Sequence, residues 1–132
     1  MGDLVRSTPT ALSTARRYLA AASVGNYALF GGGYTGSVAK DTVDAYNTSL
    51  TRSTPTALSV ARYWLAAASV GNYALFGGGY TGSASSVVDA YNTSLTRSTP
   101  TALSTACYQL AASSVGDYAL FGGGHTGSVA KD

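Results

Sequence analysis

The sequence ALSVARYWLAAASVGNYALFGGGYTG, residues 57–82, occurs almost three times in this chain. Residues 11–36 and 102–127 repeat it, and only seven of its 26 positions differ among the copies. The flanking sequence RSTPT sets a spacing of 46 and then 45 residues, beginning at Arg6, Arg52 and Arg97. A spacing of this size is typical of one supersecondary unit that stacks on its own copies, because a single unit leaves its apolar face uncovered.

The composition favours a closely packed β-protein over a helical bundle. Of the 132 residues, 45% are hydrophobic and 11% are charged, with 16 Gly and 10 Tyr, and long aliphatic side chains are few. The length predicts a single domain, residues 1–132. The net charge of +2 is too small, and the basic residues too dispersed, to indicate nucleic-acid binding.

The sequence leaves the cellular compartment open. No apolar run approaches the roughly 18–20 residues of a membrane-spanning helix, so we expect no membrane insertion. The basic and apolar sequence that begins at Arg16 superficially resembles a signal peptide, but the same block recurs in mid-chain from Arg62. A cytoplasmic and a virion- or surface-associated location are both compatible with these observations.

Each repeat predicts four short antiparallel strands joined by tight turns. In the middle copy the expected strands are residues 63–70, 73–76, 87–91 and 94–99. The Gly71-Asn72 and Asn92-Thr93 pairs are suited to turns, and Pro100 ends the last strand because it cannot donate to a ladder. Four-stranded units at this spacing are typical of the blades of a β-propeller, in which the Ala-rich strand is innermost.

The repeat units, approximately residues 11–56, 57–101 and 102–132, supply about three blades. Residues 4–8 match a fourth strand that has no third strand before it. Three blades cannot close, because propellers need roughly four to eight. We therefore expect a homodimer that forms a six-bladed ring, in which strand 4–8 of one chain completes the last blade of its partner. The alternative is a fragment of a longer propeller.

The residues that recur at the strand ends resemble the kelch repeat. They are an Arg before the first strand, a Phe-Gly-Gly after the second and a Val-Asp-Ala-Tyr in the third, at Arg16, Arg62, Phe30, Phe76, Phe121, Tyr46 and Tyr91. Leu50 and Leu95 stand near the place where this family usually carries a Trp. The resemblance implies an all-β kelch-type β-propeller with four-stranded antiparallel meanders as blades. Near-identical repeats of this kind also imply a bacterial or phage origin.

The copies differ mainly at large and polar side chains. Three consecutive positions vary, as does the position after the triple Gly and the loop beyond it. In an antiparallel meander these segments lie at one end of the blade. Arg, Tyr and Trp are typical of binding hot spots, so variation there favours a ligand-binding face over drift in tolerant loops. The predicted face comprises Arg16, Arg17, Tyr18, Tyr34, Lys40, Arg62, Tyr63, Trp64, Tyr80, Tyr108, Gln109 and His125.

The sequence contains no convincing catalytic or metal-binding set. His125 is the single histidine and Cys107 the single cysteine, so we expect no metal, no cofactor and no intrachain disulfide. Asp44 and Asp89 are predicted to cap the turn that follows the third strand. The triple Gly lacks the Gly-Lys-Ser/Thr ending of a phosphate loop, and we expect it to permit close approach of blades or a positive φ.

The function that the sequence favours is a non-enzymatic recognition scaffold for a protein or glycan ligand. One alternative is a propeller enzyme acting on sugars, and another is a structural repeat fragment without a ligand of its own. The resemblance also includes copper oxidases that carry a Tyr–Cys cross-link. Cys107 beside Tyr108 is the single hint of such a site, and no set of His ligands accompanies it.

Overall fold

The computed structural model describes residues 4–132, which contain ten β-strands and no helix. The first unit consists of β1 (Ala20–Val24), β2 (Tyr27–Gly31), β3 (Val43–Tyr46) and β4 (Arg52–Ser53). The second unit consists of β5 (Ala66–Val70), β6 (Tyr73–Gly77), β7 (Val88–Tyr91) and β8 (Arg97–Ser98). The third unit is the hairpin of β9 (Ala111–Val115) and β10 (Tyr118–Gly122). In both four-stranded sheets the strands are antiparallel and follow sequence order, so the predicted meander is confirmed.

Each unit begins with a tight hairpin whose turn contains a glycine. In the second unit Val70 pairs with Tyr73, so Gly71 and Asn72 form the turn. Gly71 has a φ of 55°, a conformation that costs glycine little because it has no Cβ. The corresponding hairpins of the first and third units have the same register. The predicted Gly-Asn turn is confirmed.

The first strand is shorter than the sequence predicts. The expected strand covers residues 63–70, whereas β5 begins at Ala66. Trp64 has a φ of 58°, in the left-handed region, and this interrupts the extended backbone. Tyr63 lies beyond the interruption and forms an isolated antiparallel bridge with Tyr80. The antiparallel pairing therefore resumes at Tyr63, on the N-terminal side of the left-handed residue Trp64.

The fourth strand is also shorter than expected. The sequence predicts a strand over residues 94–99, whereas β8 contains Arg97 and Ser98 alone. The backbone N–H groups of Ser94 and Thr96 donate to Asn92 Oδ1, at 2.9 and 3.0 Å. Asn92 thus holds residues 93–96 in a turn, and in this conformation they do not extend the ladder.

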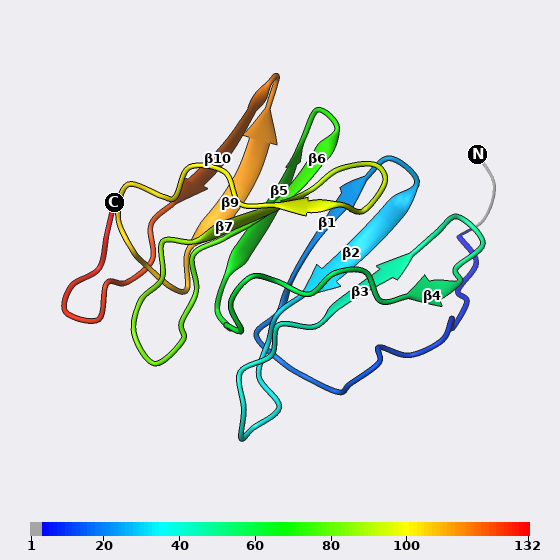
Figure 1. Cartoon of the computed structure of the whole chain (residues 1–132), viewed down its shortest axis with the longest axis horizontal. Helices are drawn as coiled ribbons and strands as arrows, with labels where there is room; N and C mark the ends of the chain where they lie inside the picture. The colour runs from blue at the N-terminus through cyan, green and yellow to red at the C-terminus, as the bar shows by residue number, and fades with distance from the viewer. Residues whose placement is uncertain (1–3) are drawn as a thin grey trace.

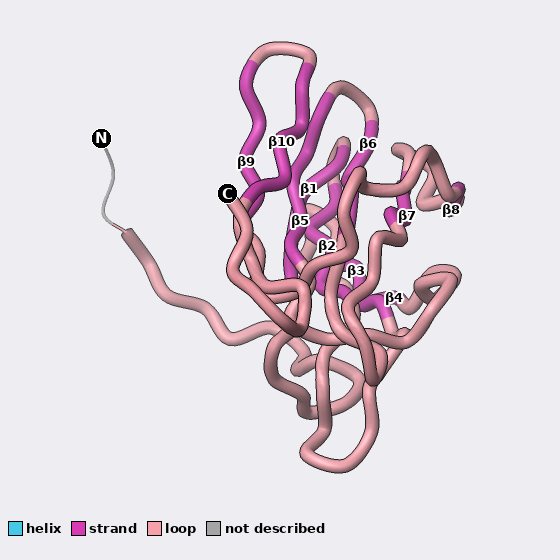
Figure 2. The backbone as a smooth tube through the Cα atoms, turned by 90° about the vertical axis from the view of Figure 1, so that its left-hand side faces the viewer, coloured by secondary structure: helices cyan, strands magenta, loops and turns pink. Residues whose placement is uncertain are grey.

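Residues 4–8 pair with no strand of this chain, and the sequence predicts that they pair with a second copy. The equivalent strand β4 pairs with the Val-Asp-Ala-Tyr sequence of β3. Leu4 is consequently 98% exposed. Figure 2 shows the N-terminal segment extending away from the sheets.

The three units stand side by side and form an open arc (Figure 1). Their first strands, β1, β5 and β9, are neighbours. The N–H group of Ser23 in β1 donates to Ser69 Oγ in β5 at 3.3 Å. The Ala-rich sequence of these strands permits this approach, because small side chains leave room between the backbones. The sheets of residues 4–132 do not close into a barrel.

A phenylalanine packed on a glycine sets the spacing between adjacent units. The Phe76 ring covers Gly31, where an added Cβ would lie 2.9 Å from Phe76 Cε2. Phe121 covers Gly77 in the same way, at 3.0 Å. Gly32 has a φ of 71°, and its Cβ would lie 2.7 Å from a backbone oxygen of the second unit. The triple glycine therefore serves both predicted purposes, close approach and positive φ.

A buried ion pair fills the interior of each four-stranded unit. Arg62 Nη1 lies 2.8 Å from Asp89 Oδ2, and both side chains are 0% exposed. The other guanidinium nitrogens of Arg62 donate to carbonyl oxygens of the second unit at 2.7 and 3.0 Å. Arg16 and Asp44 repeat the pair in the first unit at 2.9 Å. The cation is stable there because its donors find a carboxylate and carbonyl oxygens.

We expect Asp89→Asn to lower the free energy of unfolding by about 3–5 kcal/mol, because it leaves the Arg62 charge buried without its counterion. Urea denaturation followed by Trp64 fluorescence measures the loss. Asp41→Asn is the matched control, since Asp41 is exposed, and we expect it to change the midpoint little. An Asp89→Asn midpoint equal to that of the wild type would contradict the role of the pair.

Candidate functional site

The variable positions of the three copies meet at one end of each unit. In the first unit Arg17 N donates to Tyr34 O at 2.9 Å, and Tyr34 N donates to Arg17 O at 2.7 Å. Tyr63 and Tyr80 exchange the same two hydrogen bonds in the second unit, at 3.2 and 2.7 Å. In the third unit the equivalent bonds join Tyr108 to His125, at 2.9 Å each. The predicted convergence of these segments is confirmed.

One variable position has a left-handed backbone in every copy. Tyr18, Trp64 and Gln109 have φ values of 62°, 58° and 57°. The Trp64 N–H group donates to Tyr18 O at 2.9 Å, and the Gln109 N–H group donates to Trp64 O at 2.8 Å. These bonds run from unit to unit and stabilise a conformation that is unfavourable for residues with a Cβ. The backbone of this position joins the units, while its side chain is free to differ.

The aromatic side chains at these positions form a continuous row across the three units. Ring centroids are 4.6 Å apart for Tyr34 and Tyr63, and 4.9 Å apart for Tyr63 and Trp64. Trp64 stacks on Tyr108 at 5.5 Å, with 22° between the ring planes. Tyr80 contacts Tyr108 edge-on at 5.0 Å. We define the aromatic face as Arg17, Tyr18, Tyr34, Tyr63, Trp64, Tyr80, Tyr108 and His125.

Polar groups stand at both ends of the aromatic face. The Arg17 guanidinium lies over the rings of Tyr18 and Tyr34, with 5.2 and 5.6 Å from its Cζ to the two centroids. At the other end His125 Nδ1 accepts a hydrogen bond from Gly127 N at 2.9 Å. The Tyr108 hydroxyl lies 3.2 Å from the same nitrogen.

The dense packing of the row changes the pKa of Tyr63, which lies at its centre. Burial raises the pKa of the Tyr63 hydroxyl above its usual value, and the adjacent hydroxyls of Tyr34 and Tyr80 raise it further. Tyr63 consequently stays neutral across the physiological range and offers a hydrogen-bonding hydroxyl. The face is thus apolar in its ring surfaces and polar at its ring edges.

Four predicted contact residues do not belong to this face. Arg16 and Arg62 are wrong as surface residues, because their side chains are fully buried in ion pairs. Cys107, which replaces them in the third copy, is buried as well. Lys40 is half-buried, and its backbone oxygen accepts a hydrogen bond from Arg62 N at 3.1 Å. Gln109 is exposed beside the face.

The two aspartates have a different partner from the predicted one. Asp44 and Asp89 do not cap the following turn, which Asn47 and Asn92 cap instead. The carboxylates bind the buried arginines and also accept from the backbone N–H groups that precede these arginines by three residues. The sequence contains a signal for this pairing, because the Arg and the Val-Asp-Ala-Tyr sequence occur together in the first two copies.

No other functional set is evident in the described part of the chain. Residues 4–132 bring together no group of three His, Cys, Asp or Glu side chains suited to a metal ion. They also contain no helix that is long and apolar enough to cross a membrane. No known family model matches the chain, and no curated protein sequence matches it.

We expect Cys107 to react slowly with thiol reagents in the folded protein. Burial raises the pKa of its thiol, while the Lys131 ammonium lowers it by a smaller amount. Because the thiolate is the nucleophile, a raised pKa leaves less reactive thiolate at pH 7.5. Reaction with a chromogenic disulfide should be slower in native than in urea-unfolded protein. Lys131→Ala should slow the native reaction further, and equal native and unfolded rates would contradict this assignment.

Proposed function

We propose that this chain is a non-enzymatic recognition scaffold that binds a protein or a glycan ligand at the aromatic face. The observation that carries the proposal is the continuous row of rings across three units, at positions where otherwise near-identical copies differ. Positions that pack inside the units are repeated almost letter for letter. Three of the seven variable positions lie on this face, and the large side chains found there support selection for contacts with something outside the chain.

The chemistry of the face suits a ligand with apolar surfaces and hydrogen-bonding groups. Tyr and Trp supply large, rigid contact areas at a low cost in side-chain entropy. Their hydroxyl and N–H groups, with the Arg17 guanidinium, supply donors at the edges. A sugar ring and a protein loop both present such surfaces, and a screen that offers both classes of ligand separates them.

The scaffold that we propose is a kelch-type β-propeller with six blades formed by two copies of the chain. The repeated antiparallel meanders support this architecture. The residues that carry the kelch resemblance also have structural roles, because Arg62 pairs with the Asp of its Val-Asp-Ala-Tyr sequence and Phe76 packs on a glycine of the preceding unit. The exposed N-terminal residues 4–8 are suited to add a strand to a partner's last blade.

The test is a binding screen in which Trp64 serves as reporter. We expect the full-length protein to bind on a printed glycan array or to a displayed peptide library, and the soluble hit to change Trp64 emission. Tyr80→Ser combined with Tyr108→Ser removes two rings that contact Trp64, and we expect affinity for that hit to fall at least about tenfold.

The matched control is Tyr73→Ser. Tyr73 begins the same strand whose continuation leads to Tyr80, but it lies at the opposite end of the unit and is exposed. We expect this variant to bind as the wild type does. A double variant that keeps full affinity, or a Tyr73→Ser variant that loses it equally, would show that the aromatic face is not the binding surface.

A further inference from the structure

The chain contains two junctions between adjacent units, and both have the same direction. At each junction a phenylalanine of the following unit covers a glycine of the preceding unit, Phe76 on Gly31 and Phe121 on Gly77. Each unit therefore has one side with a protruding ring and one side with a glycine that receives a ring. The contact is directional, because neither side is complementary to itself.

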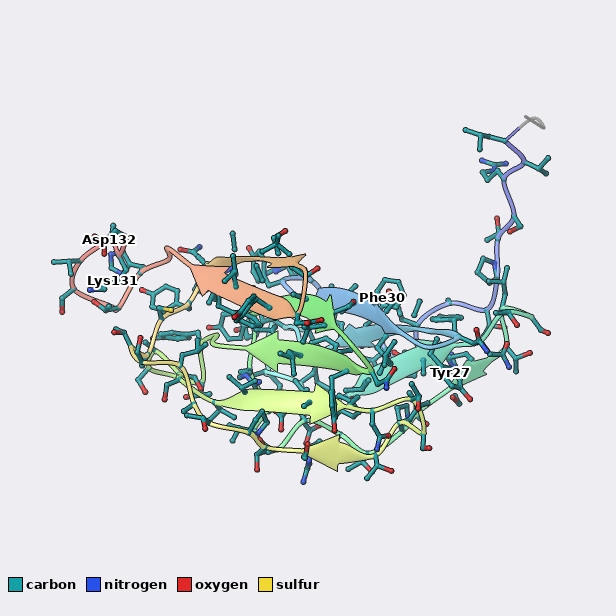
Figure 3. The ribbon with its side chains drawn as sticks, turned by 90° about the horizontal axis from the view of Figure 1, so that it is seen from above. Tyr27, Phe30, Lys131 and Asp132 are labelled. Atoms are coloured by element: carbon teal, nitrogen blue, oxygen red, sulfur yellow. The ribbon has the colours of Figure 1, made fainter. Side chains whose placement is uncertain are left out.

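The outer sides of the first and third units lack this contact. At Gly122 of β10, an added Cβ meets no atom within 4 Å. Phe30 of β2 lines an apolar groove with Leu12, Tyr46 and Leu50 on the outer side of the first unit. Figure 3 shows Phe30 in the half of the molecule opposite to the one that contains Lys131 and Asp132. The arc thus has an unpaired ring at one end and an unpaired glycine at the other.

The backbone groups at the two ends are complementary in the same direction. Inside the chain, Gly33 N donates to Arg62 O at 2.9 Å, and Arg62 N donates to Lys40 O at 3.1 Å. The residues equivalent to Gly33, Arg62 and Lys40 at the outer ends are Gly124, Arg16 and Lys131. Within residues 4–132, the N–H group of Gly124, both backbone groups of Arg16 and the carbonyl of Lys131 have no backbone partner.

The series of backbone hydrogen bonds between the left-handed residues also leaves one unpaired group at each end of the arc, within the described residues. The N–H group of Tyr18 and the carbonyl of Gln109 are the two termini of the series that passes through Trp64, and neither has a backbone partner in the described residues. One end of the arc offers a donor and the other offers an acceptor. Their positions in the repeat are those of the groups that are bonded at the internal junctions.

The apolar surface shows the same incompleteness. Leu29 of β2 is 0% exposed because the second unit covers it, whereas the equivalent Leu120 of β10 is 55% exposed. Val24 of β1 is 3% exposed, and the equivalent Val115 of β9 is 61% exposed. Exposed side chains on one sheet face are a liability unless another surface covers them.

We propose that the first unit of one copy docks onto the third unit of a second copy, with Phe30 covering Gly122. This inference rests on the two-copy ring proposed above and assigns its contact surface. The occupant is a second copy because the contacts that each end lacks are the ones this chain makes with its own repeats. Gly124 N then donates to Arg16 O of the second copy, and Tyr18 N of the second copy donates to Gln109 O. Two such junctions close the assembly.

Gly122→Val tests the docking without disturbing the isolated chain. The backbone there has an ordinary φ, a Cβ meets nothing, and Val is favourable in a strand. Against Phe30 it would collide, as a Cβ at Gly31 would with Phe76. Light scattering should give about 27 kDa for wild type, twice 13.3 kDa, and 13.3 kDa for the variant. The dissociation constant should rise at least about tenfold per junction. Ser94→Val, at an exposed turn, is the control and should stay dimeric.

A mixing experiment tests the direction of docking. Phe30→Ala removes the ring and should also weaken the dimer. When Phe30→Ala and Gly122→Val chains are mixed, one junction is of wild-type composition. The other junction sets the introduced alanine against the introduced valine, where no ring is left to collide, so a heterodimer should form. Native mass spectrometry distinguishes it from either homodimer. Absence of the heterodimer, or a Gly122→Val homodimer as tight as the wild type, would overturn the proposal.

The mass of the wild-type protein in solution tests the docking proposal independently of the proposal that the aromatic face binds a ligand. A particle of 13.3 kDa at millimolar concentration, or an open assembly of more than two copies, would overturn docking into a two-copy ring, whether or not the aromatic face binds a ligand. The opposite result is a dimer of about 27 kDa, twice 13.3 kDa, that Gly122→Val dissociates and that gives no hit on either ligand screen. This result would support the docking proposal and would contradict only the proposed recognition function.

Discussion

The packing of a phenylalanine ring on a glycine is the contact on which the spacing of the whole chain depends. Phe76 and Phe121 reach the backbone of the preceding unit because Gly31 and Gly77 have no side chain. That close approach brings β1, β5 and β9 together and allows backbone hydrogen bonds to pass from one unit to the next. A methyl group at Gly31 would hold the units apart and separate the donors from their acceptors.

The interior and the aromatic face of each four-stranded unit are built from adjacent residues with opposite requirements. Arg62 points into the unit, where Asp89 and carbonyl oxygens satisfy its donors. Tyr63, the next residue, belongs to the aromatic face and pairs through its backbone with Tyr80. The buried ion pair fixes the backbone at the point where the exposed rings begin. The rigidity of the face therefore derives from the polar interior directly beneath it.

Much of the architecture was readable from the sequence because the turn residues repeat with the strands. Gly71-Asn72 predicted the hairpin, and the antiparallel pattern predicted that Tyr63 and Tyr80 would meet. The burial of Arg62 was not predicted, because a difference between copies was interpreted as a sign of exposure. In the first two copies this Arg instead occurs together with a Val-Asp-Ala-Tyr sequence whose Asp is its partner. The short first strand was not predictable either, since Tyr18, Trp64 and Gln109 are not residue types that favour a left-handed backbone.

That left-handed position has a consequence for how the face diversifies. Tyr, Trp and Gln occupy it with φ values within a few degrees of one another, because hydrogen bonds between neighbouring units hold the main chain. The identity of the side chain is thereby uncoupled from the geometry of the scaffold. A library that randomises this one position in each repeat would vary the side-chain chemistry while the backbone positions stay fixed.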